Sequence, residues 1–133
     1  MTRIYIAAPY ARAKEARAAG LFLVSRGLCI ESTWDIAAAG PESLDSVCAA
    51  EAIKINDSEL QISDAVLCLA YRGEGGEMYC ELTRALIAGK PVYWVSMDGR
   101  DVLSAWRPGV VRCASVDDAI DQIAADFRAS RVR

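Results

Sequence analysis

One carboxylate in the sequence stands where it could do chemistry. In the segment GEGGEMYCELTRALIAGKPVYWV, from Gly73 to Val95, a glycine run leads into a helical pattern, and Glu81 lies early in that pattern. Glu81 flanks the apolar stripe of the predicted helix, in line with the small residues Ala85 and Ala88, which leave space beside it. Because a helix dipole favours negative charge near the N-terminus, we expect Glu81 to be ionised. An ionised, positioned carboxylate can attack the anomeric carbon of a sugar, as in retaining glycosidases.

The other residue types limit which chemistry is available. The 133 residues contain no histidine, which excludes histidine-based triads, histidine general acids and histidine metal sites. Catalysis must therefore use carboxylates, tyrosine, cysteine, lysine, arginine or backbone amides. Glu77 precedes Glu81 by about one turn, and we expect it to be a solvated acid of the first turn. Without the preceding glycines and its position early in the helix, Glu81 would be interpreted as a surface glutamate too.

The cysteines form no recognisable framework. They are odd in number and mostly lie within apolar runs, and no CxxC motif occurs. This pattern favours reduced, buried thiols in a cytoplasmic protein over disulfides or a metal site. The five cysteines are Cys29, Cys48, Cys68, Cys80 and Cys113.

Composition indicates one compact domain over residues 1–133. An apolar fraction of 53% is enough for a sizeable core. A net charge of −3 and a pI of about 5.0 argue against binding to polymeric nucleic acid or to an anionic membrane surface. No apolar run approaches the roughly 20 residues of a membrane span, and the N-terminus lacks the apolar region of a signal peptide.

Strand and helix patterns alternate along the chain. Short apolar runs predict strands over 3–7, 28–33, 65–71, 92–95 and 109–114. Helical spacing and breaker residues predict helices over 11–26, 43–62, 76–88 and 115–132, a short helical turn over 101–106 and a loop over 34–43. This alternation favours an α/β fold with a five-stranded parallel, doubly wound, flavodoxin-like sheet in the middle of three layers.

In such a sheet, ligands bind at the carboxyl ends of the strands. In this chain those ends carry Ala8-Pro9-Tyr10 and the segments 33–35, 71–76 and 96–100. The glycines of the third segment would let a ligand approach the backbone, although a tight turn is the simpler interpretation of a glycine-rich loop. Neither GxGxxG nor GxxxxGK[ST] occurs, which disfavours a cradle for a dinucleotide or a nucleoside triphosphate.

Four segments, in this order, resemble the nucleoside 2-deoxyribosyltransferase family, whose relatives include the 2'-deoxynucleoside 5'-phosphate N-hydrolases. They are IYIAAPY, the strand end ESTW, INDSELQISDAVLCLAY and GGEMYCELTRALIAGKPVYWV. The last is the most specific, because it follows the family pattern GxxxELGxAxxxGKPV. The resemblance covers roughly residues 4–106. It implies cleavage or transfer at the N-glycosidic bond of nucleosides or their 5'-monophosphates, with no metal or organic cofactor.

The resemblance also implies which groups react. Glu81 matches the family nucleophile, which takes the sugar at C1′, and Tyr5 matches the tyrosine that hydrogen-bonds and orients it. Ala8 matches the small residue of the YxxG/A pattern at the end of the first strand. Tyr10 and Trp34, at neighbouring strand ends, are expected to stack on the base or to wall it. From the residues alone, Tyr5 is equally a core aromatic and the other two are loop anchors.

The family acid that handles the base has two candidates in this chain. Counting back from Asp64 without a gap selects Asn56, whereas matching by residue type selects Asp57. Asn56 would bind the base but would leave the delivery of a proton unexplained. Asp57 would require the helix to shift by one residue. Asp64 itself, at the entrance of a strand, is expected to be structural.

A further segment bears on phosphate binding and assembly. GRDVLSAW resembles the N-hydrolase segment whose serine reaches the phosphate in a neighbouring subunit, and Ser104 matches that serine. A homodimer or higher homo-oligomer with shared active sites is therefore implied. The hydrolases have another phosphate-binding serine where this chain has Gly75; the backbone amides of Gly75 and Gly76, with Arg12 or Arg72, could replace it. From its type alone, Ser104 is equally a helix-surface serine.

Three other interpretations remain. One is a nucleotide-binding module or sensor in which Glu81 only hydrogen-bonds a ribose hydroxyl. Another is a phosphoribohydrolase built on the motif PGGxGTxxE, which EGGEMYCE resembles only loosely. The third is an interaction protein that has lost the site, against which the pairing of Glu81 with Tyr5 argues. The sequence does not decide the base, ribose against 2'-deoxyribose, or water against an acceptor base.

Overall fold

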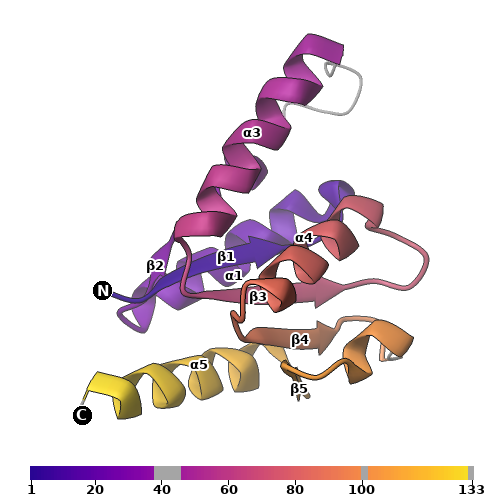
Figure 1. Ribbon diagram of the computed structural model, residues 1–133. Coiled ribbons are helices and arrows are strands. Elements are labelled where there is room, and N and C mark those ends of the chain that lie inside the picture. The colour runs from indigo at the N-terminus through magenta and orange to yellow at the C-terminus, as the bar shows by residue number, and fades with distance from the viewer. Residues whose placement is uncertain (38–45, 100–101, 132–133) are drawn as a thin grey trace.

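The structure is a computed structural model that describes residues 1–37, 46–99 and 102–131. These residues contain a sheet of five parallel strands in the order β2-β1-β3-β4-β5 (Figure 1). This is the flavodoxin-like order that the strand and helix alternation predicts. The strands are β1 (Arg3–Ala7), β2 (Cys29–Ile30), β3 (Ala65–Ala70), β4 (Val92–Ser96) and β5 (Val110–Cys113).

Helices cover both faces of the sheet and complete the three predicted layers. Two of them, α1 (Ala13–Ser25) and α5 (Val116–Arg131), pack on one face. The other two, α3 (Ser46–Ile62) and α4 (Gly76–Ile87), pack on the opposite face, with α3 leaning outward toward its N-terminal end (Figure 1). Short helical segments follow three of the strands: η1 (Tyr10–Arg12), α2 (Trp34–Ala37) and η3 (Leu103–Trp106).

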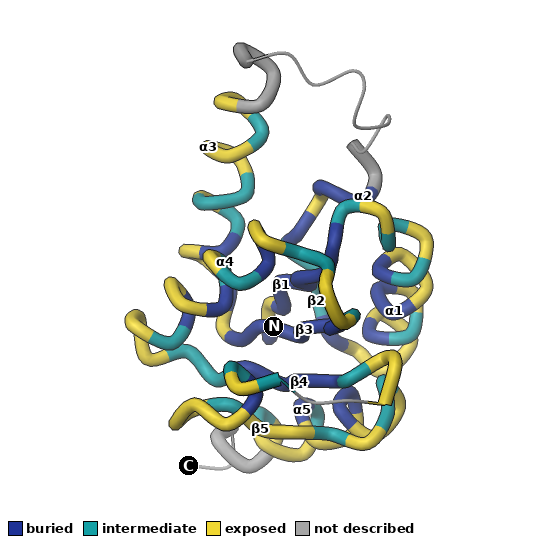
Figure 2. The backbone as a smooth tube through the Cα atoms, turned by 90° about the vertical axis from the view of Figure 1, so that its right-hand side faces the viewer, coloured by how far each residue is buried: buried dark blue, intermediate teal, exposed yellow. Residues whose placement is uncertain are grey.

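The inner strands and the helix stripes that face them form the core. Every residue of β3 is buried, as are the last four residues of β1 and the first four of β4 (Figure 2). A strand covered on both faces must be apolar throughout, which explains why these segments are continuous apolar runs. On α4, Met78, Leu82 and Ala85 are buried against the sheet, which confirms the predicted stripe. Glu81 is therefore held at the edge of a packed helix face.

The second strand is shorter than the predicted 28–33. Only Cys29 and Ile30 pair with β1, and side chains then replace the ladder. The Ile6 backbone N–H donates to Ser32 Oγ at 2.9 Å, and Trp34 Nε1 donates to the Ile6 carbonyl at 2.7 Å. Because these bonds satisfy the backbone N–H and carbonyl of Ile6, the chain after β2 can leave the sheet without leaving these groups unpaired. The loop predicted over 34–43 accordingly begins with the helix α2.

The remaining boundaries differ by a few residues. The helix predicted over 11–26 is the 3-10 turn η1 followed by α1, and the turn predicted over 101–106 is η3. The predicted start of a helix at position 43 lies outside the described residues. At the opposite edge of the sheet, Asp64 has the structural role expected of it, because its carboxylate accepts a 2.8 Å hydrogen bond from the Arg3 backbone.

The cysteines whose side chains are described, Cys29, Cys68, Cys80 and Cys113, are all free. Cys68 is buried in β3, whereas Cys80 is exposed on α4, contrary to the expectation of buried thiols. Within the described residues, no helix has both the length and the apolar character that crossing a bilayer requires.

The strand order creates a switch point between β1 and β3. These strands are neighbours in the sheet, but β1 continues into α1 on one face and β3 continues into α4 on the other. The two connections diverge at the carboxyl ends of the strands and leave a crevice between them.

Candidate active site

A cavity of about 220 Å³ lies at this switch point. It collects segments that are far apart in the sequence: the end of β1, the start of α2, the middle of α3 and the first turns of α4. Most of the residues predicted to form a site are among those that line it. The lining residues are Ala8, Pro9, Tyr10, Trp34, Asn56, Gly75, Gly76, Glu77, Met78 and Glu81.

Glu81 is the carboxylate that reaches deepest into the protein at this cavity. It lies in the second turn of α4, and its Oε2 atom is buried without a hydrogen-bond partner of normal geometry among the described residues. Burial raises the pKa of the carboxyl to about 7, opposed by its interaction with Tyr5 and reinforced by the charge of Glu77. The expected ionisation by the helix dipole is outweighed, because the dipole acts mainly on the first turn. Near neutral pH, Glu81 therefore exchanges between its two protonation states.

Tyr5 lies beneath Glu81 in the centre of β1 and is completely buried. Its hydroxyl is close enough for the Glu81 charge, together with burial, to raise the pKa of the phenol. Even so, the Tyr5 hydroxyl makes no hydrogen bond of normal geometry with any described residue. Hydrogen bonds of catalytic groups are often long in the absence of substrate and shorten when it binds. The Tyr5 hydroxyl therefore lies within electrostatic reach of the Glu81 carboxyl and has no other hydrogen-bond partner among the described residues.

Two aromatic rings make one wall of the cavity. The rings of Tyr10 and Trp34 are 5.4 Å apart between centroids and are tilted by 42°. Trp34 is almost fully buried, and its N–H is used by the Ile6 carbonyl, so the indole presents only apolar surface to the cavity. Such a wall suits the flat face of a heterocycle.

The glycine loop forms part of the rim of the cavity. Gly75 has a φ of +86° and precedes the first residue of α4. A Cβ atom at this position would lie 3.2 Å from Pro9 Cγ and 3.3 Å from Met78 Cβ, so a side chain would fit neither the backbone conformation nor the space. The loop therefore passes close to the end of β1 and exposes the first amides of α4 to the cavity.

The two candidates for the acid on α3 face different ways. Asn56 lines the cavity together with Glu81. Asp57, one residue on, forms an ion pair with Arg84 and borders a neighbouring groove between α3 and α4. Because successive helical residues point about 100° apart, only one of the two can face the cavity. The alignment without a gap is the one that matches this geometry.

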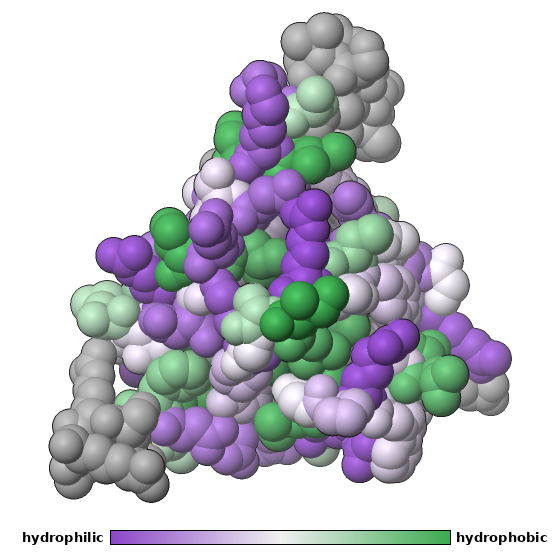
Figure 3. Space-filling model, in the orientation of Figure 1, coloured by the Kyte–Doolittle hydropathy of each residue, from purple (hydrophilic) through white to green (hydrophobic). Residues whose placement is uncertain are grey.

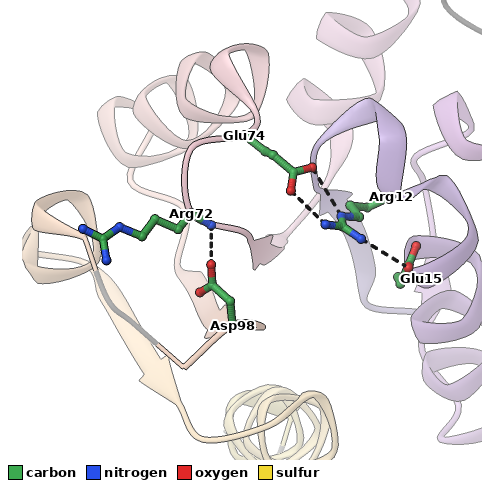
Figure 4. A network of polar contacts seen from close by, with 5 residues as sticks. All are labelled: Arg12, Glu15, Arg72, Glu74 and Asp98. Carbon is green, nitrogen blue, oxygen red and sulfur yellow. Dashed lines mark hydrogen bonds and ion pairs between the residues drawn. The ribbon is translucent and has the colours of Figure 1, made fainter.

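Arg12 is close to the glycine loop but is already engaged. Its guanidinium donates to both carboxylate oxygens of Glu74, at 2.8 and 3.3 Å, and lies 3.9 Å from Glu15 (Figure 4). The Arg12 guanidinium carbon is also 4.1 Å from the centre of the Tyr71 ring. Arg12 is not among the residues that line the cavity. It holds the loop after β3 against η1.

The other two residues predicted to contact a phosphate do not line the cavity either. The side chain of Arg72 extends away from the Arg12–Glu74 pair, while its backbone N–H donates to Asp98 at 2.6 Å (Figure 4). Ser104 lies on η3, after β4, and is half-buried. A phosphate bound in this cavity would therefore contact Ser104 only from another subunit.

Glu77 is an exposed acid in the first turn of α4, as the sequence predicts. It also borders the cavity, which was not predicted from the sequence. Its spacing of four residues from Glu81 was the available signal, since residues i and i+4 share one helix face. Within the described residues, no three acidic or cysteine side chains come together as metal ligands would.

Solved structures of other proteins share this fold. A 2-deoxyribosyltransferase from the psychrotolerant bacterium Bacillus psychrosaccharolyticus matches with a TM-score of 0.72 and 16% identity, over 90% of this chain and 91% of that chain. A CMP N-glycosidase from Clostridium botulinum matches with a TM-score of 0.62 and 13% identity, over 92% and 98%. At such identities the likeness establishes the α/β three-layer fold. No family model matches the sequence, and no curated protein does.

Proposed function

We propose that this protein cleaves or transfers at the N-glycosidic bond of 2'-deoxynucleosides, nucleosides or their 5'-monophosphates, through a glycosyl intermediate on Glu81. The observation that carries the proposal is Glu81 itself. It is a carboxylate whose buried oxygen has no partner of normal geometry in the described chain, at a cavity with an aromatic wall and a glycine rim. The structural neighbours, one a 2-deoxyribosyltransferase and the other a CMP N-glycosidase, support the same bond class.

In this mechanism the base stacks against Tyr10 and Trp34, and the sugar lies between them and Glu81. The ionised Glu81 carboxylate attacks C1′, and the bond from C1′ to the base nitrogen breaks. Tyr5 donates to the carboxylate and keeps one oxygen directed at C1′. Attack by water or by a second base on the opposite face then releases the sugar with overall retention of configuration. Each group that is given a role in these steps is a side chain of the protein.

The neighbouring backbone has a supporting role. The amides at Gly75 and Gly76 are available to a hydroxyl or a phosphate of the sugar, as at other helix N-termini. Asn56 offers a donor and an acceptor to the edge of the base. Arg12 would reach a 5'-phosphate only after exchanging Glu74 for it, so its contribution is to position the loop until a phosphate arrives.

Assembly is part of this proposal, with Ser104 serving the cavity of a neighbouring subunit. The residues beside it support this: Leu103 is 88% exposed and Trp106 is 62% exposed, and large apolar side chains of this kind are usually covered by a partner. Other exposed apolar residues include Ile53 of α3 and Ile87 of α4. On the face shown in Figure 3, hydrophobic and hydrophilic residues are interleaved. We therefore assign the shared interface to the η3 side, where the apolar residues flank Ser104.

A product assay tests the proposed function. The purified protein is incubated with the common nucleosides, 2'-deoxynucleosides and their 5'-monophosphates, with and without a second free base, and products are separated by chromatography. Release of free base supports hydrolysis, and a new nucleoside that appears only with the second base supports transfer. The folded Glu81→Gln variant serves as the control for contaminating activity. Binding without product from any substrate would instead favour a nucleotide-binding module.

A further inference from the structure

Breaking an N-glycosidic bond with a carboxylate nucleophile leaves one requirement unassigned. The departing base carries the electron pair of the broken bond and needs a proton, which general acid catalysis supplies. Retaining glycosidases meet this need with a second carboxyl group, about 5–5.5 Å from the first. The cavity must therefore contain a proton donor distinct from Glu81.

The position on α3 that faces the cavity cannot fill this role. Asn56 carries an amide, which hydrogen-bonds but does not release a proton as an acid. The nearest carboxyl group on that helix, Asp57, is turned away and paired with Arg84. Tyr10 offers a phenol, which is a much weaker acid than a carboxyl group.

Glu77 satisfies the geometric requirement. It borders the same cavity as Glu81 and lies four residues earlier on the same helix, so that the two side chains are neighbours on one helix face. The Cβ atoms of such a pair are about 5–6 Å apart, so the two side chains can bring their carboxyl groups to the separation that a retaining site requires. The charge of Glu77 also acts on Glu81, where it raises the pKa of the carboxyl. No ion pair to Glu77 occurs within the described residues, so its carboxyl is available to a bound base.

The geometry points to Glu77 as the general acid and base of the reaction, a catalytic residue paired with Glu81; this inference rests on the proposed function. Glu77 is exposed at the edge of the cavity, whereas Glu81 reaches deeper, where C1′ would lie. A bound base would cover Glu77 and remove it from solvent.

Protons and bonds balance over the two steps of the reaction. In the first, Glu81 bonds to C1′, the electron pair of the C1′–N bond moves to the base, and the Glu77 carboxyl gives its proton to the base. In the second, Glu77 as a carboxylate takes a proton from water or from an acceptor base, whose nucleophilic atom bonds to C1′. The bond between C1′ and Glu81 then breaks, and Glu81 returns as a carboxylate. Glu77 is again protonated, so the pair is ready for another cycle.

The Glu77→Gln variant tests this role with two kinds of substrate. A 2'-deoxynucleoside needs its base protonated, whereas 4-nitrophenyl 2-deoxy-β-D-ribofuranoside has a leaving group that departs as a stable anion. We expect Glu77→Gln to lower kcat on the nucleoside by about 10²–10⁴-fold, the usual value of general acid catalysis, and on the aryl glycoside by less than about 3-fold. Asp117→Asn is the matched control, because Asp117 is the second residue of α5, as Glu77 is of α4, and is remote from the cavity.

The outcomes separate this inference from the proposed function. A full rate of Glu77→Gln on nucleosides, or equal losses on both substrates, overturns the acid role while the function stands. Failure of the wild-type protein to cleave either substrate overturns both. If the protein cleaves nucleosides but rejects the aryl glycoside, the Glu77→Ala variant is assayed on nucleosides with added formate instead. Restored nucleoside cleavage supports the acid role, and no restoration overturns it.

Discussion

The carboxyl group of Glu81 and the hydroxyl of Tyr5 face each other inside the protein, close enough for each to shift the pKa of the other. Neither Tyr5 Oη nor Glu81 Oε2 has a hydrogen-bond partner of normal geometry among the described residues. Leaving two such buried groups unsatisfied is costly, commonly about 1–3 kcal/mol each. An arrangement of this kind is typical of a site that is completed by its substrate, and most of the predictions below depend on it.

Replacement of the nucleophile should abolish turnover and leave the fold intact. We expect Glu81→Gln and Glu81→Ala to have no measurable cleavage, because no other carboxyl group of the described cavity reaches the same depth. Product chromatography measures the loss, and circular dichroism checks the fold. A sugar adduct on Glu81, trapped with a slow substrate and located by mass spectrometry, would be direct support. Unchanged turnover in a folded variant would eliminate the nucleophile assignment.

Activity should rise with pH through the titration of Glu81. Its pKa is raised to about 7, chiefly by burial, with Glu77 and Asp57 raising it and Tyr5 and Arg84 lowering it. Since the proposed nucleophile must be ionised, kcat/KM of the wild-type protein on 4-nitrophenyl 2-deoxy-β-D-ribofuranoside, whose leaving group needs no proton from Glu77, should fall by about tenfold for each pH unit below about 7. The rate measured from pH 5 to pH 8 tests this. An acid limb centred near pH 4.5, the ordinary value of the carboxyl, would contradict it.

The free energy of unfolding should fall with rising pH over the range in which Glu81 titrates. The folded state binds the Glu81 proton more tightly than the unfolded state, so the free energy of unfolding falls as pH rises from about 4.5 to about 7 and is level above that. Glu81→Gln removes this loss. We expect the variant to be more stable than wild type by on the order of 3 kcal/mol at pH 8, with the difference becoming small near pH 4.5. Urea unfolding at several pH values measures it, and a constant difference would argue against a titrating Glu81.

Removal of the Tyr5 hydroxyl should slow chemistry more than it weakens binding. In Tyr5→Phe, the hydrogen bond that the proposed mechanism gives to Tyr5 and the Glu81 carboxylate cannot form, at a cost of about 1–3 kcal/mol in the transition state. This corresponds to a decrease in kcat of about 5- to 150-fold. Steady-state kinetics separate kcat from KM, and an effect on KM alone would make Tyr5 a binding or packing residue.

The two neighbours on α3 should behave differently. Asn56→Ala is expected to raise KM or lower kcat for nucleosides, because its amide borders the cavity. Asp57→Asn removes a partly exposed ion pair with Arg84, and such pairs contribute about 0–1 kcal/mol to stability. It also removes a charge that raises the pKa of Glu81, to a smaller extent than the charge of Glu77 does. Its effect on turnover should be small beside that of Asn56→Ala. The reverse order would mean that α3 presents Asp57 to the substrate.

Ser104 should link phosphate preference to assembly. If it serves a neighbouring subunit, the protein is at least a dimer, and Ser104→Ala loses one hydrogen bond to a charged phosphate, about 1.5–3 kcal/mol. The preference for 5'-monophosphates over free nucleosides should then fall by roughly ten- to a hundred-fold. Ser25→Ala, at an exposed serine of α1, is the control. A monomer in light scattering would reject the shared site, and a dimer that prefers free nucleosides would reject the phosphate role.

Several features of this protein follow from the sequence alone. The apolar runs of the inner strands demand burial on both faces, and their alternation with helices requires a parallel, doubly wound sheet. Glu81 and the glycines belong to one continuous segment, so local helix geometry is enough to place the carboxylate near the ligand edge. Ala8, Tyr10 and Trp34 lie at neighbouring strand ends, and the topology brings these to one place.

Tertiary structure decided the features that depend on contacts between distant segments. The rotation of α3 is set by its packing against α4, and that rotation turns Asn56 toward the cavity and Asp57 toward Arg84. The early end of β2 depends on hydrogen bonds from Ser32 and Trp34 to a residue of β1. The high pKa of Glu81 comes from how much water the surrounding elements exclude, which no local pattern records. Periodicity shows which residues share a face, but orientation and solvation depend on which elements meet that face, and this is determined only when the whole chain packs.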